Sequence, residues 1–284
     1  MKRIERVAVI GAGTMGHGIA QVAAAAGCDV VLLDSSAELA ERGFQHIRDN
    51  LDEGIKRGKV SEQERDQVLA RIRVSEKSAD SAADRDLIVE AVPERLDLKI
   101  AVLKEIETHA AGDAIIASNT SSLSISAMQK ALRRPQRMLG MHFFNPVHVS
   151  RLVEIVRGDA TTDDVIVSAQ AFVQRIGKEA ITVKDAPGFA TSRLGVLLGL
   201  EAMRMLEEGV ASAEDIDRAL ELGYRHPMGP LKLTDLVGLD VRLDIARYLH
   251  RELGAEHFRP PRILEELVAH GKLGKKSGEG FYKW

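Results

Sequence analysis

The sequence is poor in cysteine and in aromatic residues, and it has almost no excess of charge of one sign. Its single cysteine, Cys28, excludes an intrachain disulfide and fits a reducing compartment. The net charge of −3 gives no strong attraction to nucleic acid or to a membrane surface. Apolar runs such as 194–200 fall far short of the roughly 18 residues of a membrane span. A strand pattern begins within a few residues of the N-terminus, so we expect no targeting peptide and a cytoplasmic protein.

What is present is an ordinary globular composition over 284 residues, enough for one large domain or two smaller ones. Up to residues 184–187, apolar strand patterns alternate with helical ones. Beyond that point helical patterns follow, over 189–208, 212–222, 233–253 and 260–269, and a strand pattern returns only at 280–284. The sequence therefore predicts an α/β fold of Rossmann type over 1–185 and an all-helical domain over 186–284.

A glycine-rich turn lies between two short apolar strands, 7–10 and 30–33. The turn is Gly11-Ala12-Gly13-Thr14-Met15-Gly16, and a helical pattern runs from it to Gly27. Such glycines permit a tight turn and close approach of the backbone to a pyrophosphate, which the N–H groups of the helix N-terminus can bind. Asp34 ends the second strand, 23 residues after Gly11 (34 − 11), near the roughly 20 expected for a carboxylate on the adenosine ribose. The sequence predicts a dinucleotide site formed by these residues.

Asp34 also bears on which dinucleotide is bound. Its carboxylate would repel a 2′-phosphate, and Ser35 and Ser36 supply no arginine to hold one. NAD is therefore favoured over NADP.

Residues 36–71 are polar and helical in pattern, which predicts two antiparallel helices inserted after the second strand. Gly58 separates them, and Ser61-Glu62-Gln63-Glu64 reads as a capping box for the second. Lys56, Arg57 and Lys59 gather at the bend. Two interpretations are open: a solvated basic turn, or a grip on an anionic part of a substrate.

A polar loop, Asn119-Thr120-Ser121-Ser122, follows the strand predicted over 114–118. In open α/β sheets, ligands bind beyond the carboxyl ends of the strands. Ser122 or Ser124 could simply cap the next helix, but four consecutive polar side chains exceed what one cap needs. At least one of them is expected to face a ligand.

The chemistry centres on His142, within Met141-His142-Phe143-Phe144-Asn145-Pro146. Glu154 follows twelve residues later (154 − 142) in the apolar run 152–156, where a carboxylate needs a partner. A lone histidine in apolar surroundings is more often structural than catalytic, but this one follows a strand in a nucleotide-binding domain. We predict that Glu154 pairs with it, which fixes the tautomer and makes the imidazole more basic. Hydride transfer between a carbinol and a ketone needs one such base.

Over nearly its whole length the chain resembles the bacterial 3-hydroxyacyl-CoA and 3-hydroxybutyryl-CoA dehydrogenases. The resemblance rests on ordered motifs: Gly11–Gly16, Glu90-Ala91-Val92-Pro93-Glu94, Ser118–Ser122, His142–Pro146, Pro187-Gly188-Phe189, Pro227-Met228-Gly229-Pro230 with Gly238-Leu239-Asp240, and Ser277–Tyr282.

The resemblance implies a role for particular residues. His142 is expected to be the catalytic acid/base, with Glu154 orienting it and the Ser121 hydroxyl contacting substrate and nicotinamide. Further contacts to the nicotinamide half of NAD are implied for Glu94, Lys99, Asn119, Asn145 and Lys276, and contacts to coenzyme A for Asn50 and Arg57. The helical domain would form most of a homodimer interface and assist substrate binding, and no metal ion is expected.

One position departs from the family pattern. The family usually has asparagine where this chain has Ser192, so an amide donor near the reacting oxygen is lost. A serine hydroxyl could donate instead, directly or through water, and we hypothesise that Ser192 keeps part of the role.

The expected function is NAD-dependent interconversion of (S)-3-hydroxyacyl-CoA, such as 3-hydroxybutyryl-CoA, and 3-oxoacyl-CoA. The alternatives are a sugar-acid dehydrogenase of the L-gulonate type and a non-catalytic NAD-binding protein.

Overall fold

The chain forms two units, Met1–Asp185 and Ala186–Trp284, which are described separately. The computed structural model describes residues 2–76 and 81–284. In the described residues, none of the helices combines the length and apolar character needed to cross a membrane.

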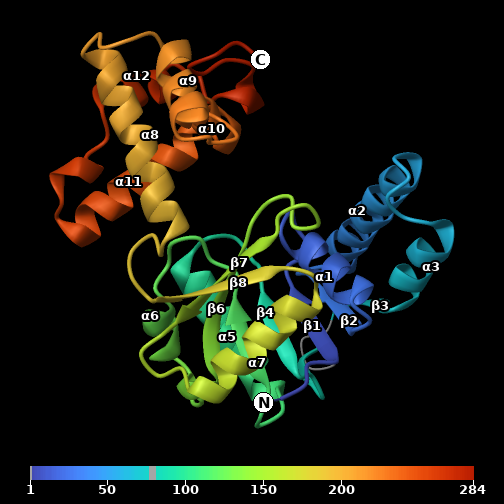
Figure 1. Ribbon diagram of the computed structural model, residues 1–284. Coiled ribbons are helices and arrows are strands. Elements are labelled where there is room, and N and C mark those ends of the chain that lie inside the picture. Colours follow the sequence, from blue (N-terminus) through green and yellow to red (C-terminus); the bar gives the residue numbers. More distant parts are fainter. Residues whose placement is uncertain (1, 77–80) are drawn as a thin grey trace. The chain divides into compact units, whose positions relative to one another are not determined.

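Unit 1 is built on an eight-stranded sheet in the order β3-β2-β1-β4-β5-β6-β7-β8 (Figure 1). All neighbouring strands are parallel except β6 and β7, which are antiparallel. The central strands are buried along nearly their whole length, as expected for a parallel sheet covered on both faces. The strands are β1 (Arg6–Ile10), β2 (Asp29–Leu33), β3 (Ile72–Ser75), β4 (Leu87–Glu90), β5 (Ile115–Ser118), β6 (Met138–Phe143), β7 (Leu152–Arg157) and β8 (Glu179–Lys184).

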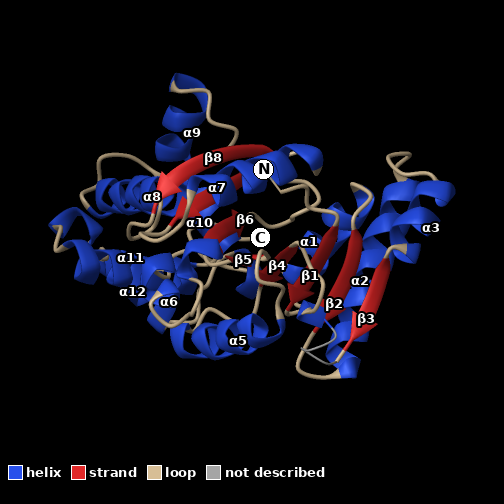
Figure 2. Ribbon diagram, turned by 90° about the horizontal axis from the view of Figure 1, so that it is seen from below, coloured by secondary structure: helices blue, strands red, loops and turns tan. Residues whose placement is uncertain are grey.

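Helices cover both faces of this sheet (Figure 2). On one face, α1 (Gly16–Ala25) and α7 (Asp163–Arg175) contribute to a single core cluster with the strands. On the other, α5 (Leu96–His109) packs on β4 and β5, and α6 (Ile125–Gln129) packs on β6. A short 3-10 turn, Pro135–Arg137, leads into β6. This layered arrangement leaves the carboxyl ends of the parallel strands open for a ligand.

The predicted helical hairpin is present between β2 and β3 as α2 (Ala37–Lys56) and α3 (Glu62–Ala70), and it projects from the sheet in Figure 1. The Ser36 side chain caps α2 by accepting a bond from the Leu39 backbone N–H. Ser61 and Glu64 form the predicted capping box, which confirms where α3 begins.

Unit 2 is helical, with α8 (Thr191–Glu207), α9 (Ala213–Gly223), α10 (Pro230–Val237), α11 (Leu239–Leu253) and α12 (Arg262–Ala269) around their own apolar core. A 3-10 turn, Glu256–Phe258, lies between α11 and α12, and another, Lys275–Ser277, follows α12. The single helix expected over 233–253 was wrong: Gly238, at φ +104°, separates α10 from α11. This backbone conformation lies outside the helical region and favours glycine.

The C-terminal segment is fastened to a buried carboxylate. Asp235 of α10 accepts bonds from the backbone N–H groups of Phe281 and Tyr282 and from the indole of Trp284, at 2.8–2.9 Å. The strand pattern at 280–284 gives only isolated bridges, Gly274 with Glu279 and Glu279 with Lys283.

Candidate active site

The glycine turn has the geometry of a phosphate cradle. Gly11 adopts φ +98°, and a Cβ at Gly16 would lie 1.6 Å from the Gly11 carbonyl oxygen, so both positions exclude larger residues. Gly13 differs, because its φ is ordinary and a Cβ there would meet no atom within 4 Å. No contact within the described protein therefore requires a glycine at position 13. A ligand lying directly against the backbone would require a glycine there. The turn thus fits a bound pyrophosphate at the N-terminus of α1.

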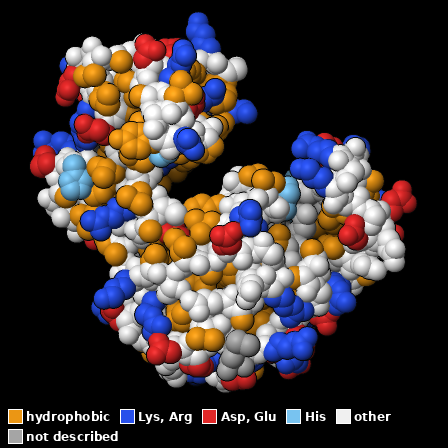
Figure 3. Space-filling model, in the orientation of Figure 1, with side chains coloured by type: hydrophobic (Ala, Val, Ile, Leu, Met, Phe, Trp, Pro, Cys, Tyr) orange, Lys and Arg blue, Asp and Glu red, His pale blue; other side chains and the backbone are white. Residues whose placement is uncertain are grey.

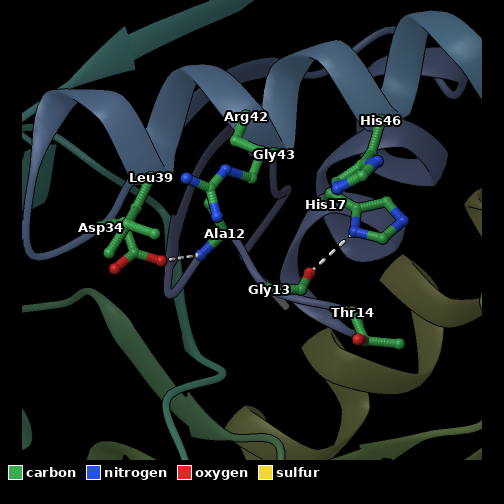
Figure 4. A pocket seen from close by; sticks show the side chains of 9 residues that line it. All are labelled: Ala12, Gly13, Thr14, His17, Asp34, Leu39, Arg42, Gly43 and His46. Carbon is green, nitrogen blue, oxygen red and sulfur yellow. Dashed lines mark hydrogen bonds between the residues drawn. The ribbon is translucent and has the colours of Figure 1, made fainter.

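A cavity of about 360 Å³ opens beside this turn (Figure 4). Asp34 lies at its edge, and its Oδ2 accepts a bond from the Ala12 backbone N–H at 2.7 Å. Its Oδ1 accepts from the Ser35 backbone N–H at 2.6 Å. Oδ1 also accepts from the Ser35 hydroxyl at 3.1 Å. Because each carboxylate oxygen has two lone pairs, Oδ2 could still accept a bond from a ribose hydroxyl. The nine lining residues are Ala12, Gly13, Thr14, His17, Asp34, Leu39, Arg42, Gly43 and His46.

One face of α2 completes the cavity, which the sequence interpretation missed. Leu39, Arg42, Gly43 and His46 recur at the spacing of a single helical face, and that spacing was the available signal. Ser35 and Ser36 carry no cation, but Arg42 brings a guanidinium to the cavity that contains Asp34. Arg42 also pairs with Glu38 at 2.8 Å.

The imidazoles of His17 on α1 and His46 on α2 are neighbours at this cavity. The ring centroids of His17 and His46 are 5.4 Å apart, and Figure 4 shows them as neighbours. The Nδ1 of His17 lies 2.8 Å from the Gly13 carbonyl oxygen and can donate to it. Burial lowers the pKa of His17 below its ordinary value, and the charges of His46 and His148 act in the same direction. These surroundings favour the neutral form of His17.

The predicted pairing of His142 with Glu154 is confirmed. The two residues are direct cross-strand partners on β6 and β7, and Nδ1 of His142 lies 2.7 Å from Oε2 of Glu154. Glu154 is fully buried and His142 is 7% exposed. Because an ionised carboxylate only accepts, Nδ1–H is the donor in this contact.

The polar loop after β5 is organised by Glu94. Its Oε1 accepts bonds from the Thr120 hydroxyl at 2.6 Å, the Ser121 backbone N–H at 2.9 Å and the Ser121 hydroxyl at 3.1 Å. Asn119 Oδ1 accepts from the Phe143 backbone N–H at 2.9 Å, which joins the loop to the residue after His142. Ser124 caps α6, as one of the two interpretations allowed. The loop therefore lies beside the imidazole–carboxylate pair.

Lys99 contributes to this region from inside the protein. Its side chain has no exposed surface, and Nζ lies 2.8 Å from Oε1 of Glu90 and 3.4 Å from Oε2 of Glu94. Nζ also donates to the carbonyl oxygen of Asn119 at 3.4 Å. A direct contact between Lys99 and a cofactor, as the resemblance implied, is not available to a fully covered ammonium. Lys99 instead acts on the site through Glu94 and the loop.

The remaining expected residues of unit 1 lie on the hairpin and on the segment after β6. Asn50 Nδ2 donates to Gln21 Oε1 across α2 and α1 at 3.3 Å. Arg57, at the end of α2, is exposed and pairs with Glu53 at 2.9 Å. Asn145 is exposed, two residues beyond the end of β6. Their ligand contacts stay predictions.

Two expected residues belong to unit 2. Ser192 lies in the first turn of α8 and is partly buried. Lys276 is exposed in the 3-10 turn Lys275–Ser277, and its Nζ lies 2.6 Å from the carboxylate of Asp240. Their contributions to catalysis and cofactor binding also stay predictions.

A Rossmann-type glycine turn, a carboxylate after the second strand and a buried imidazole–carboxylate pair define a class: a dinucleotide-dependent oxidoreductase. Comparison with known proteins agrees. The family model of the 3-hydroxyacyl-CoA dehydrogenase NAD binding domain matches residues 6–186, and that of the C-terminal domain matches residues 188–284. The chain belongs to the 3-hydroxyacyl-CoA dehydrogenase family, an NAD-dependent family of oxidoreductases.

Similar proteins come from bacteria and animals. A probable 3-hydroxybutyryl-CoA dehydrogenase of Bacillus subtilis is 42% identical over 99% of this chain and 98% of its own length. The human mitochondrial hydroxyacyl-coenzyme A dehydrogenase is 41% identical, over 99% of this chain and 91% of its own. The crystal structure of (S)-3-hydroxybutyryl-CoA dehydrogenase from Ralstonia eutropha matches with a TM-score of 0.95 and 42% identity, over 99% of both chains.

Proposed function

We propose that this protein is an NAD-dependent (S)-3-hydroxyacyl-CoA dehydrogenase that interconverts 3-hydroxyacyl-CoA esters, such as 3-hydroxybutyryl-CoA, and their 3-oxo forms. The observation that carries this proposal is the 2.7 Å contact between Nδ1 of His142 and the buried carboxylate of Glu154. The names of the relatives supply the substrate class. The single cysteine and balanced charge suit a cytoplasmic enzyme.

The residues of unit 1 fit NAD. The backbone of residues 11–16 would hold the pyrophosphate and Asp34 the adenosine ribose, while Glu94, Asn119, Ser121 and Asn145 are our candidates for the nicotinamide half. NAD supplies the hydride acceptor for oxidation, and its reduced form supplies the donor in the reverse direction.

His142 provides the proton chemistry in this proposal. During oxidation, Nε2 takes the proton of the C3 hydroxyl as the C3–H bond breaks, and the imidazolium that forms is stabilised by Glu154. During reduction, the imidazolium returns the proton to the C3 oxygen. The carboxylate holds the ring in the tautomer that has Nε2 unprotonated, which is the form a base requires.

The Ser121 and Ser192 hydroxyls are our candidates for donors to the substrate, and Asn50 and Arg57 for contacts to coenzyme A. The charged tail of coenzyme A would suit the basic bend after α2, in agreement with the second interpretation of that turn.

We also propose that unit 2 mediates a homodimer and helps to bind the substrate. Large apolar side chains remain exposed on it, and hydrophobic surface recurs over this unit in Figure 3. The most exposed of them are Leu194, Val210, Leu222 and Tyr224, at 59–77%. Apolar surface of this kind marks an association site. Light scattering on the purified protein should give the mass of two chains.

The test of the function is consumption of NADH with acetoacetyl-CoA, followed by absorbance, beside oxidation of L-gulonate with NAD. We expect turnover of the thioester and none of the sugar acid. A protein that binds NADH but leaves acetoacetyl-CoA unchanged would refute the proposal and favour a non-catalytic role.

A further inference from the structure

An aromatic side chain contacts the imidazole of His142. The ring centroids of His142 and Phe144 are 4.3 Å apart, and the ring planes are inclined by 43°. His142 is 7% exposed and Phe144 is half-buried. Flat rings whose centroids are this close cannot meet edge to edge, so at least one of them presents its face to the other. The phenyl ring therefore shields part of the imidazole from water, while Glu154 holds Nδ1.

The position of Phe144 follows from the strand that precedes it. β6 ends at Phe143, and side chains two residues apart on an extended chain point to the same face of a sheet. Phe143 points to the opposite face, where it belongs to the core cluster that includes residues of α1 and α7. On the His142 face, an ideal Cβ at Gly140 would lie 2.9 Å from Cδ1 of Ile125 in α6. The ring pair thus lies on the α6 face of the sheet.

The phenyl ring affects the two protonation states of His142 differently. The face of an aromatic ring attracts a cation that lies within about 6 Å of its centroid. The imidazolium form is such a cation, whereas the imidazole form carries no charge. An aliphatic side chain of similar size would exclude water to a similar extent but would lack this attraction. The ring contact therefore favours the protonated form.

We propose that Phe144 is a positioning residue that stabilises the imidazolium form of His142 and steadies the ring against Glu154. This inference rests on the proposed function, in which the imidazolium gives its proton to the C3 oxygen during reduction. A more stable imidazolium keeps reduction active to higher pH. Oxidation needs the unprotonated imidazole, so the same contact moves the onset of oxidation to higher pH. Both directions of the reaction thus report the contact.

Charged groups from several segments also surround His142. In the described part of unit 1, the titratable or charged residues on these segments include Glu154 on β7, Glu90, Glu94 and Lys99 around the loop after β5, Asp185 beside α6, and His148, Arg151 and Lys178 around the connection from β6 to β7. Glu154 contacts the imidazole directly. Replacing Phe144 removes none of these groups, so a shift in the pH dependence of turnover would report the aromatic ring.

The test is the dependence of kcat/KM on pH, between about pH 5 and pH 10, which brackets the titration of histidine. It is measured for acetoacetyl-CoA with NADH and for 3-hydroxybutyryl-CoA with NAD. In Phe144→Leu, which keeps an apolar side chain without an aromatic face, the pH of half-maximal kcat/KM should fall by about 0.5–1 pH unit in both directions. This equals a loss of about three- to tenfold in the affinity of the imidazole for its proton. Phe144→Tyr, which keeps the aromatic face, should keep the profile of the unaltered protein.

Phe44→Leu is the matched control, because Phe44 on α2 is also half-buried and its ring lies 5.8 Å from the guanidinium carbon of Arg48. It should leave the profile unchanged. A Phe144→Leu profile that is lower at every pH but has the same midpoint would reduce the ring to a packing role and overturn the inference. Absence of turnover in the unaltered protein would refute the proposed function instead. Titration of the His142 ring followed by NMR would then decide the inference by the same shift between the unaltered protein and Phe144→Leu.

Discussion

Replacing Glu154 by glutamine separates the charge of the carboxylate from its hydrogen bond. The amide oxygen of Glu154→Gln can still accept from Nδ1 of His142, so the free energy of unfolding should change by only about 1 kcal/mol. The negative charge that stabilises the imidazolium is lost, and because Glu154 is fully buried, water does not screen that charge. We expect kcat to fall by about 10²–10⁴-fold, the range that general acid–base catalysis contributes.

The assay is the rate of NADH oxidation at saturating acetoacetyl-CoA, with the Kd for NADH measured by fluorescence. The Kd should be unchanged, since Glu154 belongs to the proton-transfer pair and not to the nucleotide cradle. Glu179→Gln on neighbouring β8 is the matched control, because Glu179 is exposed and pairs only with Arg151 among the ion pairs found in the described residues. A Glu154→Gln protein that keeps more than about a third of its kcat would refute the orienting and charge-stabilising role.

Three further predictions concern other parts of the molecule. Ser192→Ala should lower kcat/KM with acetoacetyl-CoA, by up to about 10²–10³-fold if the Ser192 hydroxyl alone takes the place of the amide donor of the family asparagine. An unaltered kcat/KM would show that Ser192 has no part in catalysis. Asp34→Ser should raise the KM for NADH by about 10–100-fold, because it removes hydrogen bonds to a charged group, and it should allow NADPH to be used with the help of Arg42. The double variant Asp34→Ser with Arg42→Ala should lose the use of NADPH, and steady-state kinetics with both nucleotides test this. Burial and the hydrogen bond to Asp217 raise the pKa of Tyr282, so the folded state retains the phenol proton that the unfolded chain loses near pH 10. The stability measured by thermal melting should therefore fall as the pH rises above about 10, and it should fall less steeply in Tyr282→Phe.

The parts of the fold that follow local patterns could be predicted from the sequence. The glycine turn, the hairpin with its capping box and the pairing of His142 with Glu154 each rest on short-range spacing or on the need of a buried carboxylate for a partner. The direction of β7 could not be predicted, because apolar runs in parallel and antiparallel strands look alike and pairing is decided by residues distant in sequence. Gly238 stands inside a helical pattern, and only its observed φ shows that the chain turns there.

The residues of the candidate site, too, could be predicted from the sequence only where they follow local spacing. Arg42 lines the cavity beside the glycine turn because four residues of α2 share one face, and the residues next to Asp34 in the sequence do not reveal it. The resemblance implies that Lys99 contacts a ligand, but its ammonium is covered by groups from two segments, residues 90–92 and the loop at Asn119. Spacing predicts which side chains share a face, but it does not predict what covers them.

The antiparallel pairing of β6 and β7 means that the sheet itself aligns the Glu154 carboxylate with the His142 imidazole. Neighbouring residues of a strand point to opposite faces, so one residue inserted within β7 would send the carboxylate of Glu154 away from His142 and would expose apolar side chains at the same time. Insertions in the part of the connecting segment 144–151 that follows the buried Val147 would leave this alignment intact. Length variation between homologous enzymes should therefore accumulate in that connection and be absent from the two strands, since a shift in either strand would disturb both the core and the proposed proton-transfer pair.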